Sequence, residues 1–160
     1  MDAAGEEDAF MTWVAPHLPR MGALAARLAS PPDRDDIVQM ALLRAWSKRN
    51  QYDAARGAAS VWLMAITANE ARKSHRFRRA IEPLADTLRQ PIHAPEGRLD
   101  LLSALRHLAR RQRLAVDCFY FAGLTVAETA AVMGCSEGTV KSTLADARAA
   151  LRRSLGDGDV

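Results

Sequence analysis

The segment that most constrains the fold is residues 124–153, which read LTVAETAAVMGCSEGTVKSTLADARAALRR. Thr125 and Glu128 have the spacing of a capping box, in which the hydroxyl accepts from the third helical amide and the carboxylate accepts from the amide of the cap residue. Ser136 can cap a second helix, and Gly134 can adopt the positive φ that ends the first. The segment therefore predicts two helices joined by a tight turn.

The second of these helices has one apolar face and one open face. Val140, Leu144, Ala147 and Leu151 recur at intervals of four, three and four residues, which places them on one stripe toward a core. The open face begins with small or hydrogen-bonding residues and continues with cations, as a helix in the major groove of DNA requires. The candidate DNA-reading residues are Ser136, Thr139, Lys141, Ser142, Ala145, Asp146 and Arg148. A helical hairpin that only packs is the alternative at this point.

The chain of 160 residues reads as helical throughout, because alanine and arginine are frequent and alternating β-branched residues are scarce. Helices are expected at about 6–29 with a break at Pro16 and Pro19, and at about 36–48, 60–79, 99–108 and 110–122. Residues 80–98 contain three prolines and lose the helical period, which predicts a flexible linker. We therefore predict an all-α protein with two small helical domains, residues 1–79 and 99–160.

Composition limits the partners and the compartment. The net charge of +3 at pH 7 is compatible with a polyanionic partner without establishing one. Cys118 and Cys135 lack metal-ligand spacing, which favours reduced thiols in the cytosol. The chain has no apolar run of membrane length and begins with acidic residues, so we predict a cytoplasmic protein without membrane contact of its own. Scattered histidines and the lack of a phosphate-binding glycine loop predict no catalytic group, metal site or cofactor.

Three stretches resemble a known family. Residues 35–46, DDIVQMALLRAW, and the QYDAARGAASVWLMAITANEARKSHR that soon follows resemble the second region of the extracytoplasmic-function sigma factors, the compact promoter-recognition subunits of bacterial RNA polymerase. Residues 124–153 resemble their fourth region, and the resemblance spans nearly the whole chain. It implies an alternative sigma factor with core RNA polymerase, promoter DNA and an anti-sigma factor as partners, in which the chemistry belongs to polymerase.

The resemblance also implies roles for individual residues. The helix face that docks on core polymerase would carry Asp35, Asp36, Gln39 and Leu43. The minus-ten DNA would bind at Tyr52, Arg56, Asn69, Arg72, Lys73 and Arg76, and the fourth region would read the minus-thirty-five duplex. Tyr52 and Asn69 could hold an extruded base by stacking and hydrogen bonding, although a helix-internal hydrogen bond is an equally open interpretation of Asn69. The basic run that begins at Arg72 could instead be a solvated helix end.

Four positions depart from the family pattern. Met40 stands where an acidic residue is frequent, and Ala59 replaces a common aromatic. Lys73 occupies a position where aspartate is common, and Asp146 one where an arginine usually contacts a base.

Two other functions remain open from the sequence. A free-standing helix-turn-helix regulator would dimerise on a palindromic site, and it leaves residues 35–46 without a role. A sigma-like mimic that only titrates an anti-sigma factor could lose its basic DNA contacts, whereas this chain retains them at Arg72 and Lys141.

Overall fold

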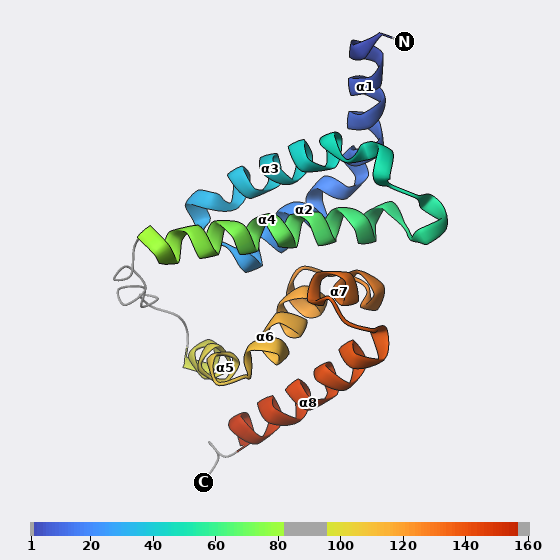
Figure 1. The fold of residues 1–160 in the computed structure, drawn as a ribbon. Helices are drawn as coiled ribbons and strands as arrows, with labels where there is room; N and C mark the ends of the chain where they lie inside the picture. Colours follow the sequence, from blue (N-terminus) through green and yellow to red (C-terminus); the bar gives the residue numbers. More distant parts are fainter. Residues whose placement is uncertain (1, 82–95, 157–160) are drawn as a thin grey trace.

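The computed structural model describes the backbone of residues 2–81 and 96–156, and the side chains of residues 2–74 and 100–156. Within these ranges the regular structure is helical, which confirms the all-α fold class (Figure 1). The helices are α1 (Ala3–Val14), α2 (Leu18–Leu28), α3 (Arg34–Ser47), α4 (Ala59–Ile81), α5 (Glu96–Arg106), α6 (Arg110–Val116), α7 (Val126–Met133) and α8 (Glu137–Gly156). Both α4 and α5 extend into the segment predicted as a linker, and the rest of that segment lies outside the described residues.

Prolines and glycines set several helix ends as the sequence predicts. The expected break near Pro16 is confirmed, because α1 ends at Val14 and a short 3₁₀ turn leads into α2. Pro19 lies in the first turn of α2, where a missing amide hydrogen has no consequence. Gly134 ends α7 with φ of 65°, in the left-handed region that a side chain disfavours.

The N-terminal half is a bundle in which α2, α3 and α4 pack together and α1 projects beyond them (Figure 1). Its core includes Val14, Met21, Leu24, Leu63 and Met64, which are all fully buried. Rings from α1, α3, α4 and the loop before α4 pack at one end of this bundle; they belong to Phe10, Trp13, Trp46, Tyr52 and Trp62.

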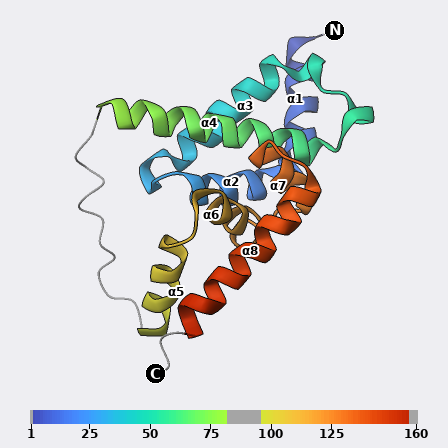
Figure 2. The same ribbon diagram turned by 60° about the horizontal axis from the view of Figure 1, so that its bottom comes forward.

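The C-terminal half places α5, α6 and α7 against the long helix α8 (Figure 2). Val140, Leu144 and Ala147 are buried, and Leu151 packs against the same cluster, so the predicted apolar stripe of α8 is confirmed. A π-helical segment, Asp117–Phe121, follows α6 and leads into the turn before α7.

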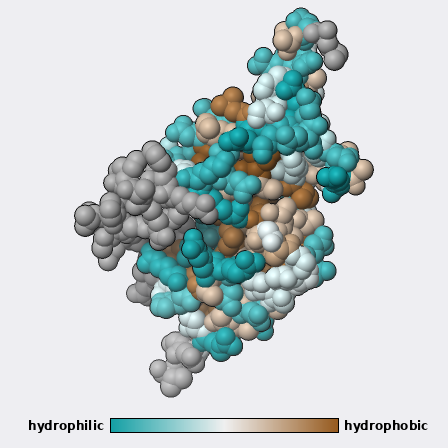
Figure 3. Space-filling model, viewed as in Figure 1, coloured by the Kyte–Doolittle hydropathy of each residue, from teal (hydrophilic) through white to brown (hydrophobic). Residues whose placement is uncertain are grey.

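The two halves pack against each other through one apolar cluster, while a second cluster lies within the C-terminal half. Helix α4 lies along α7, and α2 contacts the π-helical segment. One continuous apolar cluster joins Met21, Leu24 and Leu63 of the first half to C-terminal residues, namely Cys118, Ala122, Leu124 and Val132. Figure 3 shows hydrophobic surface gathered in the middle of one face, between the hydrophilic outer parts of the molecule. Sharing a core removes more apolar surface from water than two domains of this size can do alone.

Ion pairs reinforce the packing of the two halves. Arg20 of α2 binds Glu128 of α7 at 2.6 Å and donates to the carbonyl oxygen of Gly123 at 3.0 Å. Arg27, two turns further along α2, binds Asp117 at 2.5 Å. Its guanidinium also lies over the ring of Phe121, 4.0 Å from the centroid.

Cys118 lies inside the shared cluster and is fully buried. Burial, with a smaller contribution from the nearby charge of Asp117, raises the pKa of its thiol from 9.0 to about 12, against an opposing effect of Arg72. The thiol is therefore protonated at neutral pH, and both its burial and its protonation suppress reaction with electrophiles.

Glu128 has two functions in the fold. Its carboxylate accepts from the amide of Thr125 at 2.8 Å, and the Thr125 hydroxyl accepts from the amide of Glu128 at 3.1 Å, which confirms the predicted capping box. The same carboxylate is only 2% exposed and binds Arg20. One side chain thus begins α7 and attaches it to the other half of the molecule.

We expect Glu128→Gln to destabilise the protein more than Thr125→Ala does. The threonine substitution removes one cap hydrogen bond, at a cost of about 1 kcal/mol. The glutamine weakens both the cap and the interaction with Arg20, for which a loss of about 2 kcal/mol is expected because the acceptor is charged and buried. Urea unfolding followed by circular dichroism measures the free energy of unfolding of both variants.

Glu137→Gln, which changes an exposed carboxylate in the first turn of α8, is the charge-matched control. A cost for Glu128→Gln no larger than that of this control would contradict the expectation.

Candidate polymerase and nucleic-acid interfaces

The predicted polymerase-binding residues lie on the outer face of α3. Ile37, Ala41 and Ala45 face the core, which leaves the opposite side of the helix in solvent. Asp35, Asp36, Gln39 and Leu43 are all exposed there, together with Met40.

Leu43 and Met40 are 62% and 49% exposed, an unusual degree for large apolar side chains and one that favours a protein partner. An acid, an amide and two apolar groups on successive turns suit docking of another helix. The sequence pointed to Leu43, but Met40 entered only as a departure from the family pattern.

Tyr52 and Arg56 lie on the connection between α3 and α4. The ring of Tyr52 packs between Trp13 and Trp62, at centroid distances of 5.3 and 5.4 Å, and its hydroxyl donates to the carbonyl of Gly57 at 3.2 Å. In this arrangement Tyr52 therefore serves the packing of the aromatic cluster. The side chain of Arg56 is 89% exposed, 3.6 Å from the carboxylate of Asp53, and is open to a ligand.

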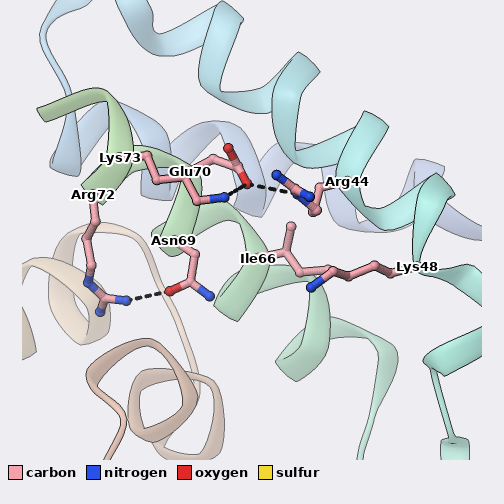
Figure 4. Close-up of a pocket in the computed structure, with 7 residues that line it drawn as sticks. All are labelled: Arg44, Lys48, Ile66, Asn69, Glu70, Arg72 and Lys73. Atoms are coloured by element: carbon pink, nitrogen blue, oxygen red, sulfur yellow. Dashed lines mark hydrogen bonds and ion pairs between the residues drawn. The ribbon is translucent and has the colours of Figure 1, made fainter. Parts of the chain in front are cut away.

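Three other predicted minus-ten residues come together at one open pocket of about 290 Å³ between α3 and α4 (Figure 4). The pocket is lined by Arg44, Lys48, Ile66, Asn69, Glu70, Arg72 and Lys73. Asn69, Arg72 and Lys73 were predicted, whereas Tyr52 is not among the lining residues. Arg44, Lys48 and Glu70 were missed. The signal for the first two was their spacing of four residues near the end of α3, which puts both cations on one face.

The pocket combines four cations with one buried carboxylate. Glu70 is 7% exposed, and its Oε1 accepts from Arg44 Nε at 3.4 Å and from Lys73 Nζ at 2.9 Å. Asn69 Oδ1 accepts from Arg72 Nη1 at 2.9 Å, which is the helix-internal bond that the sequence left open (Figure 4). The Asn69 amide nitrogen and the cation heads can serve a base edge and the flanking phosphates of a single strand.

Arg72 connects this pocket to the C-terminal half. Its Nη2 donates to the backbone carbonyl of Val132, in the last turn of α7. In this arrangement Arg72 is thus held by the helix that precedes the predicted recognition helix. Arg76 and the remainder of the basic run continue α4 as backbone, and their side chains lie outside the described residues.

The N-terminal end of α8 has the geometry expected of a recognition helix. Ser136 Oγ accepts from the amide of Thr139 at 3.2 Å and lies 2.9 Å from its hydroxyl, which confirms Ser136 as the cap. Gly138, in the first turn, leaves the approach free of bulk. All seven candidate residues are exposed, namely Ser136, Thr139, Lys141, Ser142, Ala145, Asp146 and Arg148.

Among the candidate residues of α8, the two cations lie along one flank and Asp146 along the next. Lys141, Ala145 and Arg148 follow one another at helical spacing, and Asp146 lies one turn beyond Ser142. Arg148 Nη1 donates to the hydroxyl of Tyr120 at 2.9 Å, so a residue of the π-helical segment that the sequence did not single out orients it.

Two further features bear on other classes of function. Among the described residues, no helix is long and apolar enough to cross a membrane. Among the side chains that the structure describes, those of residues 2–74 and 100–156, no group of three or more His, Cys, Asp or Glu could hold a metal ion.

Comparison with known proteins agrees with this arrangement. The family described as Sigma-70 region 2 matches residues 13–81, and the one described as Sigma-70, region 4 matches residues 98–151. The chain is 36% identical to the ECF RNA polymerase sigma factor SigM of Mycobacterium tuberculosis over 96% of its own length and 80% of that protein. It is 32% identical to SigL of the same organism, over 76% of this chain and 73% of the relative.

Solved structures extend the similarity to the whole chain. The sigma factor RpoE in complex with the anti-sigma factor NepR, from Bartonella quintana, aligns with a TM-score of 0.69 at 28% identity, covering 92% of this chain and 97% of that one. CnrH in complex with the cytosolic domain of CnrY aligns with a TM-score of 0.68 at 30% identity, covering 99% and 94%.

We expect Asp146 to act by exclusion on the DNA that α8 contacts. Phosphates repel a carboxylate at the groove, and among base edges only a donor such as cytosine N4 favours it. Asp146→Arg should raise general affinity for duplex DNA and shift the preferred sequence toward guanine contacts, whereas Lys141→Ala should cost roughly 1–3 kcal/mol if Lys141 reads a base. A selection from randomised duplexes measures both preferences. Identical preferences for the wild type and Asp146→Arg would leave Asp146 as a solvated residue without a role in readout.

Proposed function

Because the chain belongs to the extracytoplasmic-function sigma factors, it is an alternative sigma factor that directs transcription initiation, and we propose which of its surfaces carries each step. The outer face of α3 binds core RNA polymerase. The pocket at Asn69 and Arg72 receives the minus-ten DNA, and the exposed face of α8 reads the minus-thirty-five duplex. The observation that carries this assignment is the presence of three separate surfaces on the two regions that match the family: an α3 face that exposes Met40 and Leu43 beside acidic and amide groups, a cation-lined pocket, and the open face of α8.

Catalysis is assigned to polymerase and not to this chain. The sigma factor contributes binding energy and position, and its side chains form a docking face, a strand pocket and a groove-reading helix. We place the protein in the bacterial cytoplasm, where core polymerase and promoter DNA are available to it. A free-standing helix-turn-helix regulator does not account for the match of residues 13–81 to Sigma-70 region 2.

We also propose that the packed arrangement of the two halves precedes polymerase binding and is the form on which an anti-sigma factor acts. One of the two N–H groups of Arg72 Nη2 donates to Val132 in the packed form, so a DNA phosphate that takes this N–H would compete with the packing of the halves. Two structures that resemble this chain over more than nine-tenths of its length were solved with an anti-sigma factor or with the cytosolic domain of CnrY. That similarity supports an inhibitory protein as a partner of the packed form.

The proposed function is tested by transcription with core polymerase reconstituted with this chain, followed by sequencing of the transcripts. We expect initiation at a defined set of promoters.

Asp36→Arg combined with Gln39→Ala should weaken the complex with core polymerase several-fold or more, through the removal of hydrogen bonds and the reversal of charge. Asp53→Asn, on the exposed loop before α4, is the control that changes an acid outside the docking face. Unchanged capture of core enzyme by the double variant would contradict the docking assignment.

Opening of the two halves should make Cys118 reactive. In a Cys135→Ser background Cys118 is the remaining cysteine of the sequence, and it is buried and protonated in the packed form. We expect iodoacetamide to modify it slowly in the free protein and at least several-fold faster when core polymerase is bound, because separation of α4 from α7 exposes the thiol. Mass spectrometry of the alkylated protein measures the rate. Equal rates in the two samples would contradict domain opening on polymerase binding.

A further inference from the structure

We propose that Glu70 is a positioning residue for the minus-ten DNA: its buried carboxylate holds Arg44 and Lys73 at the pocket so that their charged heads bind backbone phosphates. The inference rests on the proposed function of the pocket and assigns a role to a residue that the sequence did not single out. Glu70 does not itself touch DNA in this proposal. It acts through the two cations that it anchors.

The geometry separates the anchored side of each cation from its open side. Glu70 Oε1 accepts from both Arg44 Nε and Lys73 Nζ, while the carboxylate itself is 7% exposed (Figure 4). The side chains of Arg44 and Lys73 are 44% and 57% exposed. Each cation is therefore held from the protein side and can still meet a ligand from the solvent side.

The two cations come from different helices. Arg44 lies near the end of α3, and Glu70 and Lys73 lie one turn apart on α4. Lys48 and Arg72 line the same pocket, so without a carboxylate four like charges would repel one another and the long side chains would move apart. Lysine and arginine side chains lose considerable rotamer freedom when they are fixed. A carboxylate that fixes them before DNA arrives reduces the entropy lost on binding.

A test is available because the two roles of Glu70 predict opposite changes in DNA affinity when its charge is removed. A negative charge next to a phosphate site repels DNA, so its removal should strengthen binding if Glu70 contributes only its charge. If Glu70 positions Arg44 and Lys73, its removal should weaken binding although the site becomes more positive. A purely structural link between α3 and α4 would change the unfolding midpoint without changing how many phosphates the pocket neutralises.

The experiment uses core polymerase carrying the full chain and a short fluorescent oligothymidylate as the probe, with affinity measured by anisotropy over a series of salt concentrations. Glu70→Gln should weaken binding several-fold. It should also lower the slope of log affinity against log salt by about 0.7 for each single-strand phosphate that the variant no longer neutralises. Glu7→Gln, an exposed carboxylate on α1, removes the same charge from the same half of the protein and serves as the matched control. It should leave the affinity unchanged or slightly increased.

Lys73→Met and the double variant Lys73→Met with Glu70→Gln complete a thermodynamic cycle. If Glu70 acts by holding Lys73, Lys73→Met should lower the salt slope by about 0.7, the value for one phosphate of a single strand, and Glu70→Gln should have a smaller effect in that background. Lys73 is itself exposed, and Arg44 remains as a partner of the Glu70 carboxylate in this variant. If the ion pair merely neutralised Lys73, Lys73→Met would leave the slope unchanged, which would overturn the proposal.

The remaining outcomes separate this proposal from the function of the pocket. Binding by Glu70→Gln as tight as by Glu7→Gln, together with weak binding by Lys73→Met, would overturn the role of Glu70 and leave the pocket as a DNA site. Wild-type affinity and salt slope in both Lys73→Met and Arg72→Met would overturn the pocket as a DNA site, and the role of Glu70 with it. Weakened binding and a reduced slope in Glu70→Gln, absent from its control, would support the proposal.

Discussion

The buried carboxylate of Glu128 is the group on which the arrangement of this protein depends. A carboxylate that is 2% exposed must be surrounded by donors, and Glu128 obtains them from the cap of its own helix and from Arg20 of the other half. The start of α7 and the position of α2 are thereby fixed by one group. Since α8 follows α7 after a three-residue turn that begins at the left-handed Gly134, the direction of the predicted recognition helix relative to the first half depends on the same carboxylate.

Packing of the two halves also has a consequence for function. The apolar cluster that joins them is extensive, but it is supplemented by polar interactions that use functional side chains, above all the bond from Arg72 to Val132. A residue that we propose for DNA binding thus also contributes to the packed arrangement. In the function that we propose, polymerase, DNA and an inhibitory partner act on one equilibrium, because each stabilises one arrangement at the expense of the other.

The sites were predicted from sequence to different extents. Helical spacing placed Asp36 and Gln39 on one face of α3, and the family resemblance added Leu43. The apolar stripe of α8 left its candidate residues on the open face of that helix. Sequence spacing could not show whether Tyr52 and Asn69 lie together, because this depends on how the loop before α4 folds back. The structure packs Tyr52 against tryptophans and leaves Asn69 at the pocket between α3 and α4. Glu70 was missed for the same reason. Its spacing indicates the local pair with Lys73, but its burial and its contact with Arg44 of another helix depend on the packing of α3 against α4.

The sequence by itself determined the helices, their caps, the buried stripe of α8 and the family to which the chain belongs. These properties depend on residues within a few positions of one another, where backbone geometry and side-chain period act directly. The packing of the two halves, the burial of Glu70 and Glu128, and the attachment of Arg72 to α7 were decided only by the tertiary structure. Each of them brings together groups that are distant along the chain. Whether a charged group there is exposed to solvent or buried in an ion pair depends on the partner that the fold supplies.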